Sequence, residues 1–115
     1  MMITRFQSGG HIMDIKCNDS ELKEIVLSCI DSYENIFSFK QLCDIVCQKL
    51  DKDDLLIKEK NTVYQGGFKL AFAVTDKIQL FVWEQIWDRK IIIDLLNDEY
   101  RYTPDRNSVR LIKLK

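Results

Sequence analysis

The chain of 115 residues has one proline, four glycines and one histidine, and these scarcities limit the chemistry it can carry. With His11 as its sole imidazole, a nucleophile paired with histidine has at most one base available. Gly66 and Gly67 lack the Gly-x-x-x-x-Gly-Lys pattern of a phosphate-binding loop, so we interpret them as a turn between strands. No catalytic signature is visible, and we expect a protein that is not an enzyme.

Long apolar runs and a strong charge of one sign are absent too. No run approaches the roughly 20 apolar residues of a membrane span, and the N-terminus does not resemble a secretory signal. Lysine and arginine number 17 against 18 for aspartate and glutamate, which gives a formal net charge of -1. We therefore expect a cytoplasmic protein with no membrane association, and one without the overall basic excess typical of nucleic-acid binders.

The cysteines and acids do not form a recognisable metal site. Cys43 and Cys47 are four residues apart and could share one metal on a helix, yet no Cys-x-x-Cys or histidine pair completes the roughly four ligands that zinc needs. We predict reduced, buried core thiols, no metal and no cofactor. Acid pairs such as Asp94 with Asp98 are interpreted as solvated surface, and an enzyme that uses either residue is a third hypothesis.

Length and composition favour one domain, because 46% hydrophobic residues suffice for one core. We assign residues 13–115 to a single α+β domain and residues 1–12 to a doubtful N-terminal arm. Gly9-Gly10 can be encoded by GGAGG plus one base, a ribosome-binding sequence ahead of Met13. One hypothesis therefore makes Met13 the natural start in a prokaryote or its phage, and the other makes residues 1–12 an ordinary strand or arm.

Two stretches have the spacing of amphipathic helices. In residues 18–33 the apolar residues recur at i, i+3, i+4 and i+7, and Asn18 can cap the first turn. Ser38 and Gln41 form a capping box that predicts a second helix from Phe39. The polar cluster at 51–54 ends it, and the short link between the two helices predicts a packed pair.

The remaining sequence favours strands. Alternating apolar residues from Phe68 and a β-branched, aromatic run to Trp83 predict a β-hairpin over 68–83. Shorter strands are expected at 55–57 and 62–65, and a closing strand at 109–114. The apolar residues in 86–102 fit both the period of a helix and that of a strand, but the length of this segment without glycine or proline favours a helix. The predicted fold is α+β, with an N-terminal helix pair packed on a small, mainly antiparallel sheet.

The leading hypothesis for function is a small non-enzymatic protein of the inhibitor or immunity type, encoded by a phage or mobile element, that binds another protein. Residues 14–60 contain eleven acids against seven bases. Such a mildly acidic helical half could cover a basic site on a target. The predicted contact residues are Glu21, Glu24, Asp31 and Glu34. The sequence leaves the oligomeric state open.

The alternative is a nucleic-acid-associated, winged-helix-like domain that uses the basic C-terminal segment. Residues 99–115 contain two acids against five bases that could neutralise phosphates, namely Arg101, Arg106, Arg110, Lys113 and Lys115. Trp83 and Trp87 would add a stacking surface for bases if they faced solvent. Core packing has more weight for both indoles, because they continue an apolar face of the predicted strand.

Overall fold

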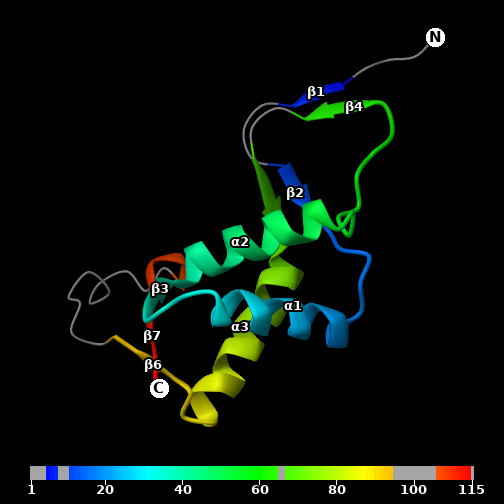
Figure 1. Ribbon diagram of the computed structural model, residues 1–115. Helices are drawn as coiled ribbons and strands as arrows, with labels where there is room; N and C mark the ends of the chain where they lie inside the picture. The colour runs from blue at the N-terminus through cyan, green and yellow to red at the C-terminus, as the bar shows by residue number, and fades with distance from the viewer. Residues whose placement is uncertain (1–4, 8–10, 65–66, 95–105, 115) are drawn as a thin grey trace.

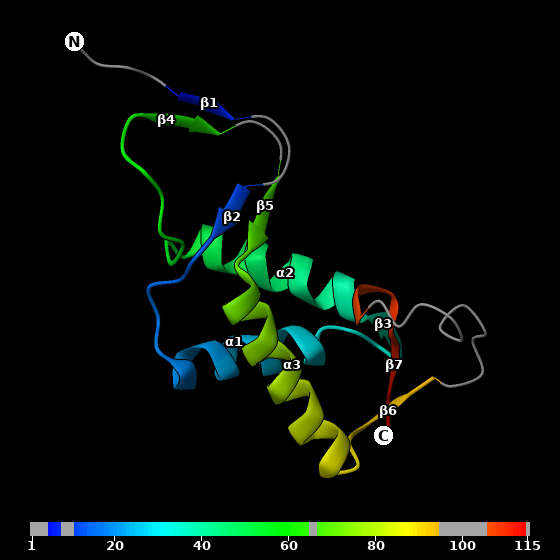
Figure 2. The same cartoon turned by 180° about the vertical axis from the view of Figure 1, so that it is seen from behind.

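The computed structural model describes residues 5–7, 11–64, 67–94 and 106–114. Figures 1 and 2 show the chain from two opposite sides. Within the described residues it has three α-helices and seven short strands, so the α+β class predicted from the sequence is confirmed. None of these helices has the length and apolarity that a membrane crossing requires.

The two predicted N-terminal helices are confirmed as α1 (Asp19–Asp31) and α2 (Phe39–Lys52). Asn18 caps α1, because its Oδ1 accepts a hydrogen bond from the Glu21 backbone N–H at 2.8 Å. At α2, Ser38 Oγ accepts from the Gln41 N–H at 3.0 Å, and the Ser38 N–H donates to Gln41 Oε1 at 2.8 Å. Both bonds of the capping box are present, so the start of α2 is fixed locally.

The β-hairpin predicted over 68–83 is wrong. β5 (Phe68–Leu70) is a strand, but it leads directly into α3 (Phe72–Trp87). Val74, Ile78 and Val82 are buried at a spacing of four residues, which is the period of a helix. The period is hard to see because α3 is apolar on most of its circumference. The N-cap position is Ala71, whose side chain cannot mark a helix start.

The helix favoured for 86–102 is also wrong where the chain is described. α3 ends at Trp87, and Arg89 adopts a left-handed φ of 59°. The next element is β6 (Ile91–Ile93), whose three β-branched side chains suit a strand. Residues 95–102 lie outside the described residues.

A three-stranded antiparallel sheet closes the C-terminal half. It consists of β3 (Ile36–Ser38), β7 (Arg110–Lys113) and β6 in the order β3-β7-β6, and a short 3-10 helix, η2 (Arg106–Ser108), precedes β7. β7 confirms the closing strand predicted at 109–114. Leu111 pairs with Phe37 on one side and with Ile93 on the other, and this row faces the core.

Two small parallel ladders join the N-terminal residues to the segment between α2 and α3. β1 (Arg5–Gln7) pairs with β4 (Thr62–Tyr64), and β2 (His11–Met13) pairs with β5. The β1–β4 pair projects away from the helices (Figure 1). These ladders are parallel, whereas the sequence predicted a mainly antiparallel sheet. The choice between Met1 and Met13 as natural start stays a prediction.

The core lies between the three helices and the inner face of the β3-β7-β6 sheet. Each element contributes fully buried apolar side chains. They include Leu22 and Val26 from α1, Leu42, Val46 and Leu50 from α2, Val74 and Ile78 from α3, and Phe37, Ile91 and Leu111 from the sheet. α1 packs against both α2 and α3, and the far side of α3 points to solvent.

Candidate functional site

α3 exposes large apolar side chains on the side that points away from the core. The exposed fractions are 79% for Phe72, 61% for Leu80, 43% for Trp83 and 82% for Trp87. At 100° per residue, these four side chains and Asp76 fall within about 80° of the helix circumference. We call this set the outer face of α3. A helix that is apolar on opposite sides is expected where both sides are covered.

The outer face of α3 is large for a monomer. From the exposed fractions and the usual areas of these side chains, it presents roughly 500 Å² of apolar surface. The largest apolar patch of a typical soluble monomer is about 300–600 Å², and patches of that size often mark interaction sites. Figure 2 shows α3 in front of α1, on the near side of the molecule.

A pocket of about 80 Å³ opens beside the outer face of α3, where this helix meets β6 and η2. Its lining is mostly apolar and consists of Phe39, Gln79, Val82, Trp83, Ile86, Ile93, Arg106, Val109 and Leu111. These lining residues include no cysteine, histidine, serine or acid that could act as nucleophile or base. The pocket is suited to holding one apolar side chain of a partner.

Arg106 ties η2 to α3 along the edge of this pocket. Its guanidinium donates hydrogen bonds to the Asp76 carboxylate, to Gln79 Oε1 at 3.0 Å and to Thr75 Oγ1 at 2.7 Å. It also lies 5.8 Å from the centres of two phenylalanine rings. Its side chain is 27% exposed. Arg106, which was predicted to bind a phosphate, therefore makes most of its contacts within its own chain.

The other predicted nucleic-acid contacts do not form one basic track among the described residues. Lys113 Nζ donates to the Tyr33 carbonyl at 2.8 Å and to the Asp31 carbonyl at 3.4 Å, so it satisfies carbonyls at the C-terminal end of α1. Arg110 is exposed on β7. Arg101 and Lys115 lie outside the described residues.

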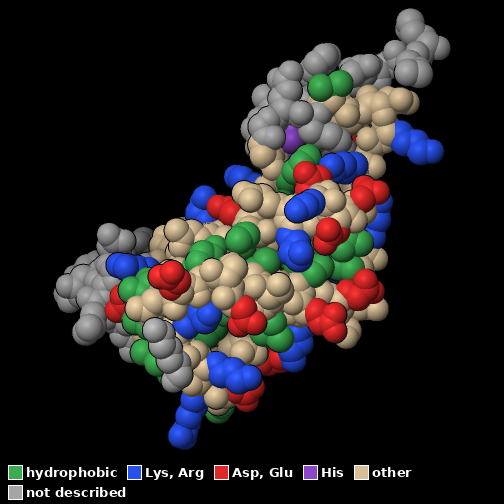
Figure 3. Space-filling view, in the orientation of Figure 1, with side chains coloured by type: hydrophobic (Ala, Val, Ile, Leu, Met, Phe, Trp, Pro, Cys, Tyr) green, Lys and Arg blue, Asp and Glu red, His purple; other side chains and the backbone are tan. Residues whose placement is uncertain are grey.

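The acidic residues predicted to contact a protein are all exposed. Glu21, Glu24 and Asp31 lie on α1, and Glu34 lies in the loop before β3. On the face of the molecule shown in Figure 3, acidic and basic side chains are interspersed over α1 and α2. Such mixing weakens the negative potential with which this half was expected to cover a basic site on a target.

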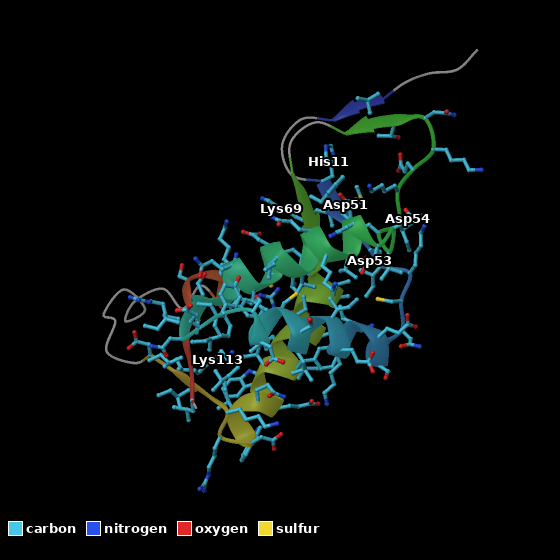
Figure 4. The ribbon with its side chains drawn as sticks, in the orientation of Figure 1. His11, Asp51, Asp53, Asp54, Lys69 and Lys113 are labelled. Atoms are coloured by element: carbon cyan, nitrogen blue, oxygen red, sulfur yellow. The ribbon has the colours of Figure 1, made fainter. Side chains whose placement is uncertain are left out.

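A second group of acids, at the C-terminal end of α2, is paired with lysines. Figure 4 shows Asp51, Asp53 and Asp54 close together near β2, far from Lys113. Asp51 pairs with Lys58 at 2.5 Å, and the other two acids lie 3.9 and 4.0 Å from lysine Nζ atoms. Among the described residues, no group of three His, Cys, Asp or Glu is placed to hold a metal ion.

The thiols are not activated. Cys29 and Cys47 are buried, as predicted, and Cys43 is partly buried. Burial raises the pKa of Cys43 to about 12 and that of Cys47 to about 11. Both thiols are therefore protonated at neutral pH and poor nucleophiles.

The assignment of the indoles to the core is wrong for Trp87, and Trp83 also keeps 43% of its surface exposed. No common surface was predicted for Phe72, Leu80, Trp83 and Trp87, because the predicted hairpin contained the first three. Plotting residues 72–87 on a helical wheel separates them from the buried side.

Comparison of the chain with protein-family models, curated proteins and solved structures gives no match.

Proposed function

We propose that this chain is a non-enzymatic binding protein whose partner docks on the outer face of α3. The observation that carries the proposal is the exposure of four large apolar side chains along one side of a single helix. Tryptophan is enriched among the residues that dominate protein–protein binding energies. The adjoining pocket offers a place for one apolar side chain of the partner.

The charges around α3 favour a protein partner over nucleic acid. Asp76 pairs with Arg106 and Glu84 pairs with Lys23, while the exposed Asp88 is followed in the sequence by Arg89 and Lys90. Lys77 is bonded to Asp19 at 2.8 Å, and this hydrogen bond raises its pKa. A surface that binds single-stranded nucleic acid combines aromatic rings with a positively charged groove. The rings are present on α3, but Lys23, Lys77 and Arg106, which lie near this helix in the described part of the chain, are each paired with an acid.

The order of elements supports nucleic-acid binding as a second candidate. α1, β3, α2, α3, β6 and β7 follow one another, with the sheet order β3-β7-β6. This is the connectivity of a winged-helix domain, with residues 53–71 inserted between α2 and α3. In that arrangement α3 takes the place of the recognition helix, and β6 and β7 are the paired strands that follow it.

Connectivity alone does not assign function. A recognition helix contacts phosphates and base edges through several basic or amide side chains. The outer face of α3 instead presents Phe72, Leu80, Trp83 and Trp87, and its one charged residue, Asp76, is acidic. We therefore rank protein binding first. An inhibitor or immunity role, a phage or mobile-element origin and a cytoplasmic location fit this proposal and are retained as parts of it.

Two sets of charge-changing variants test the proposal. Trp87→Glu and Leu80→Glu alter the outer face of α3, whereas Glu21→Lys and Glu24→Lys alter the acidic face of α1. All four positions are exposed, so the fold should tolerate each change. In the native cell, we expect the α3 variants to lose the copurifying partner and the α1 variants to keep it.

If the α1 variants lose the partner and the α3 variants keep it, the partner binds the acidic residues of α1 instead. A mobility shift of short DNA or RNA that weakens steeply with salt, and that Arg110→Ala reduces, would instead favour the nucleic-acid candidate.

A further inference from the structure

We propose that the partner on the outer face of α3 is a second copy of this chain, packed antiparallel about a two-fold axis that passes beside Leu80. This inference rests on the proposed function, because it uses the same surface. It adds the identity of the partner and the geometry of the contact.

The apolar residues of α3 are arranged almost symmetrically along the helix. The two most exposed rings, Phe72 and Trp87, stand at its two ends, and Leu80 stands midway between them. In an antiparallel pair, Phe72 of each copy meets Trp87 of the other, while the two Leu80 side chains meet near the axis. A patch that complements itself in this way is what an isologous two-fold interface requires.

The charges on and beside the outer face do not oppose this pairing. Antiparallel packing brings Asp76 of one copy toward Glu84 of the other, which would repel if both carboxylates were free. Asp76 is bonded to Arg106, and Glu84 pairs with Lys23 at 2.7 Å. Each acid is thus neutralised within its own chain.

The area of the outer face indicates how tight the dimer should be. Two copies of a patch of roughly 500 Å² would together bury about 1,000 Å² of apolar surface. A stable interface usually buries about 1,200–2,000 Å² in total, of which little more than half is apolar. Polar rim atoms would therefore bring this contact into the standard range. We expect a dimer that dissociates at micromolar concentrations.

Sedimentation equilibrium of the full chain, from micromolar to millimolar concentration, tests this inference. We expect an average mass that rises from 13.6 kDa toward twice that value. Trp87→Glu should weaken dimerisation at least about a hundredfold, because each dimer loses the anchor twice. Glu24→Lys is the matched control, also exposed and helical, and should leave dimerisation unchanged.

A short bis-maleimide tests the geometry. Cys17 and Cys43 are only partly buried, so both are first replaced by serine. In this background Leu80→Cys should give a covalent dimer, whereas Glu24→Cys should not. A chain that sediments as a monomer at every concentration overturns the inference. If Trp87→Glu still abolishes capture of a different protein, the proposed function survives that result. A dimer that Trp87→Glu does not weaken overturns the inference as well, since the contact then lies elsewhere.

Discussion

Replacing Arg106 with alanine should destabilise the fold, because this side chain joins the C-terminal segment to α3. Its guanidinium makes two hydrogen bonds to neutral acceptors, Gln79 Oε1 and Thr75 Oγ1, and one ion pair with Asp76. Hydrogen bonds of charged groups contribute about 1.5–3 kcal/mol each when buried. Here the site is partly solvated and the Asp76 side chain is 63% exposed, so its ion pair contributes at most about 1 kcal/mol.

Together these terms predict a loss of about 2–3 kcal/mol in the free energy of unfolding for Arg106→Ala. For a domain of this size, about 1 kcal/mol corresponds to roughly 4 °C, so the melting temperature should fall by about 10 °C. Arg106→Lys keeps the charge but not the planar fork of donors, and should lose about half as much. Calorimetry or circular dichroism at one fixed protein concentration measures both variants, since self-association also changes apparent stability.

Arg110→Ala is the matched control, because Arg110 is exposed on the strand that follows η2. Its free energy of unfolding should stay within about 0.5 kcal/mol of the wild type. An Arg106→Ala variant as stable as the Arg110→Ala control would refute the reasoning. Arg106 would then be a free surface base, as the nucleic-acid hypothesis requires.

Three further predictions concern the fold. Ser38→Ala removes one hydrogen bond of the capping box and should lower the free energy of unfolding, measured in urea, by about 1 kcal/mol, whereas Ser38→Thr should lower it less. The thiol of Cys43 has a pKa of about 12 when folded against 9.0 when free, so the native state holds the extra proton above pH 9. Cys43 should therefore lower the free energy of unfolding by up to about 1.4 kcal/mol per pH unit between those values. Cys47 adds a similar decline up to about pH 11, so Cys43→Ala should remove only the share of Cys43. A chain that begins at Met13 lacks β1 and the first two residues of β2, including the buried His11. Its melting temperature should therefore be lower. An unchanged melting temperature would show that residues 1–12 are dispensable for the stability of the fold.

The part of the fold that the sequence predicted correctly is the part with strong local signals. Ser38 and Gln41 can satisfy each other's backbone only at a helix start, so the boundary of α2 follows from two residues. Asn18 marks the start of α1, because its side chain accepts a hydrogen bond from the Glu21 backbone N–H. β7 was predicted because the turn-forming residues Thr103, Pro104 and Asn107 precede Val109, Leu111 and Ile112 in the sequence.

α3 was missed because two signals pointed the wrong way. Its N-cap is Ala71, which provides no side-chain acceptor, and apolar residues surround the helix, so no polar side reveals its period. The same property makes α3 the candidate site, since a helix that buries Ile78 and exposes Trp87 has an unused apolar side. The parallel ladders β1–β4 and β2–β5 could not be read from local pattern, because they join residues far apart in sequence.

Photocrosslinking in the native cell tests the central claim, that the outer face of α3 is the contact surface. A photoreactive amino acid would replace Trp87 in one variant and Glu24 in another, so that the two exposed helical faces are compared directly. We predict a crosslinked product from position 87 and none from position 24, and a product of twice the chain mass if the partner is a second copy. A product from position 24 with none from position 87 would contradict the claim.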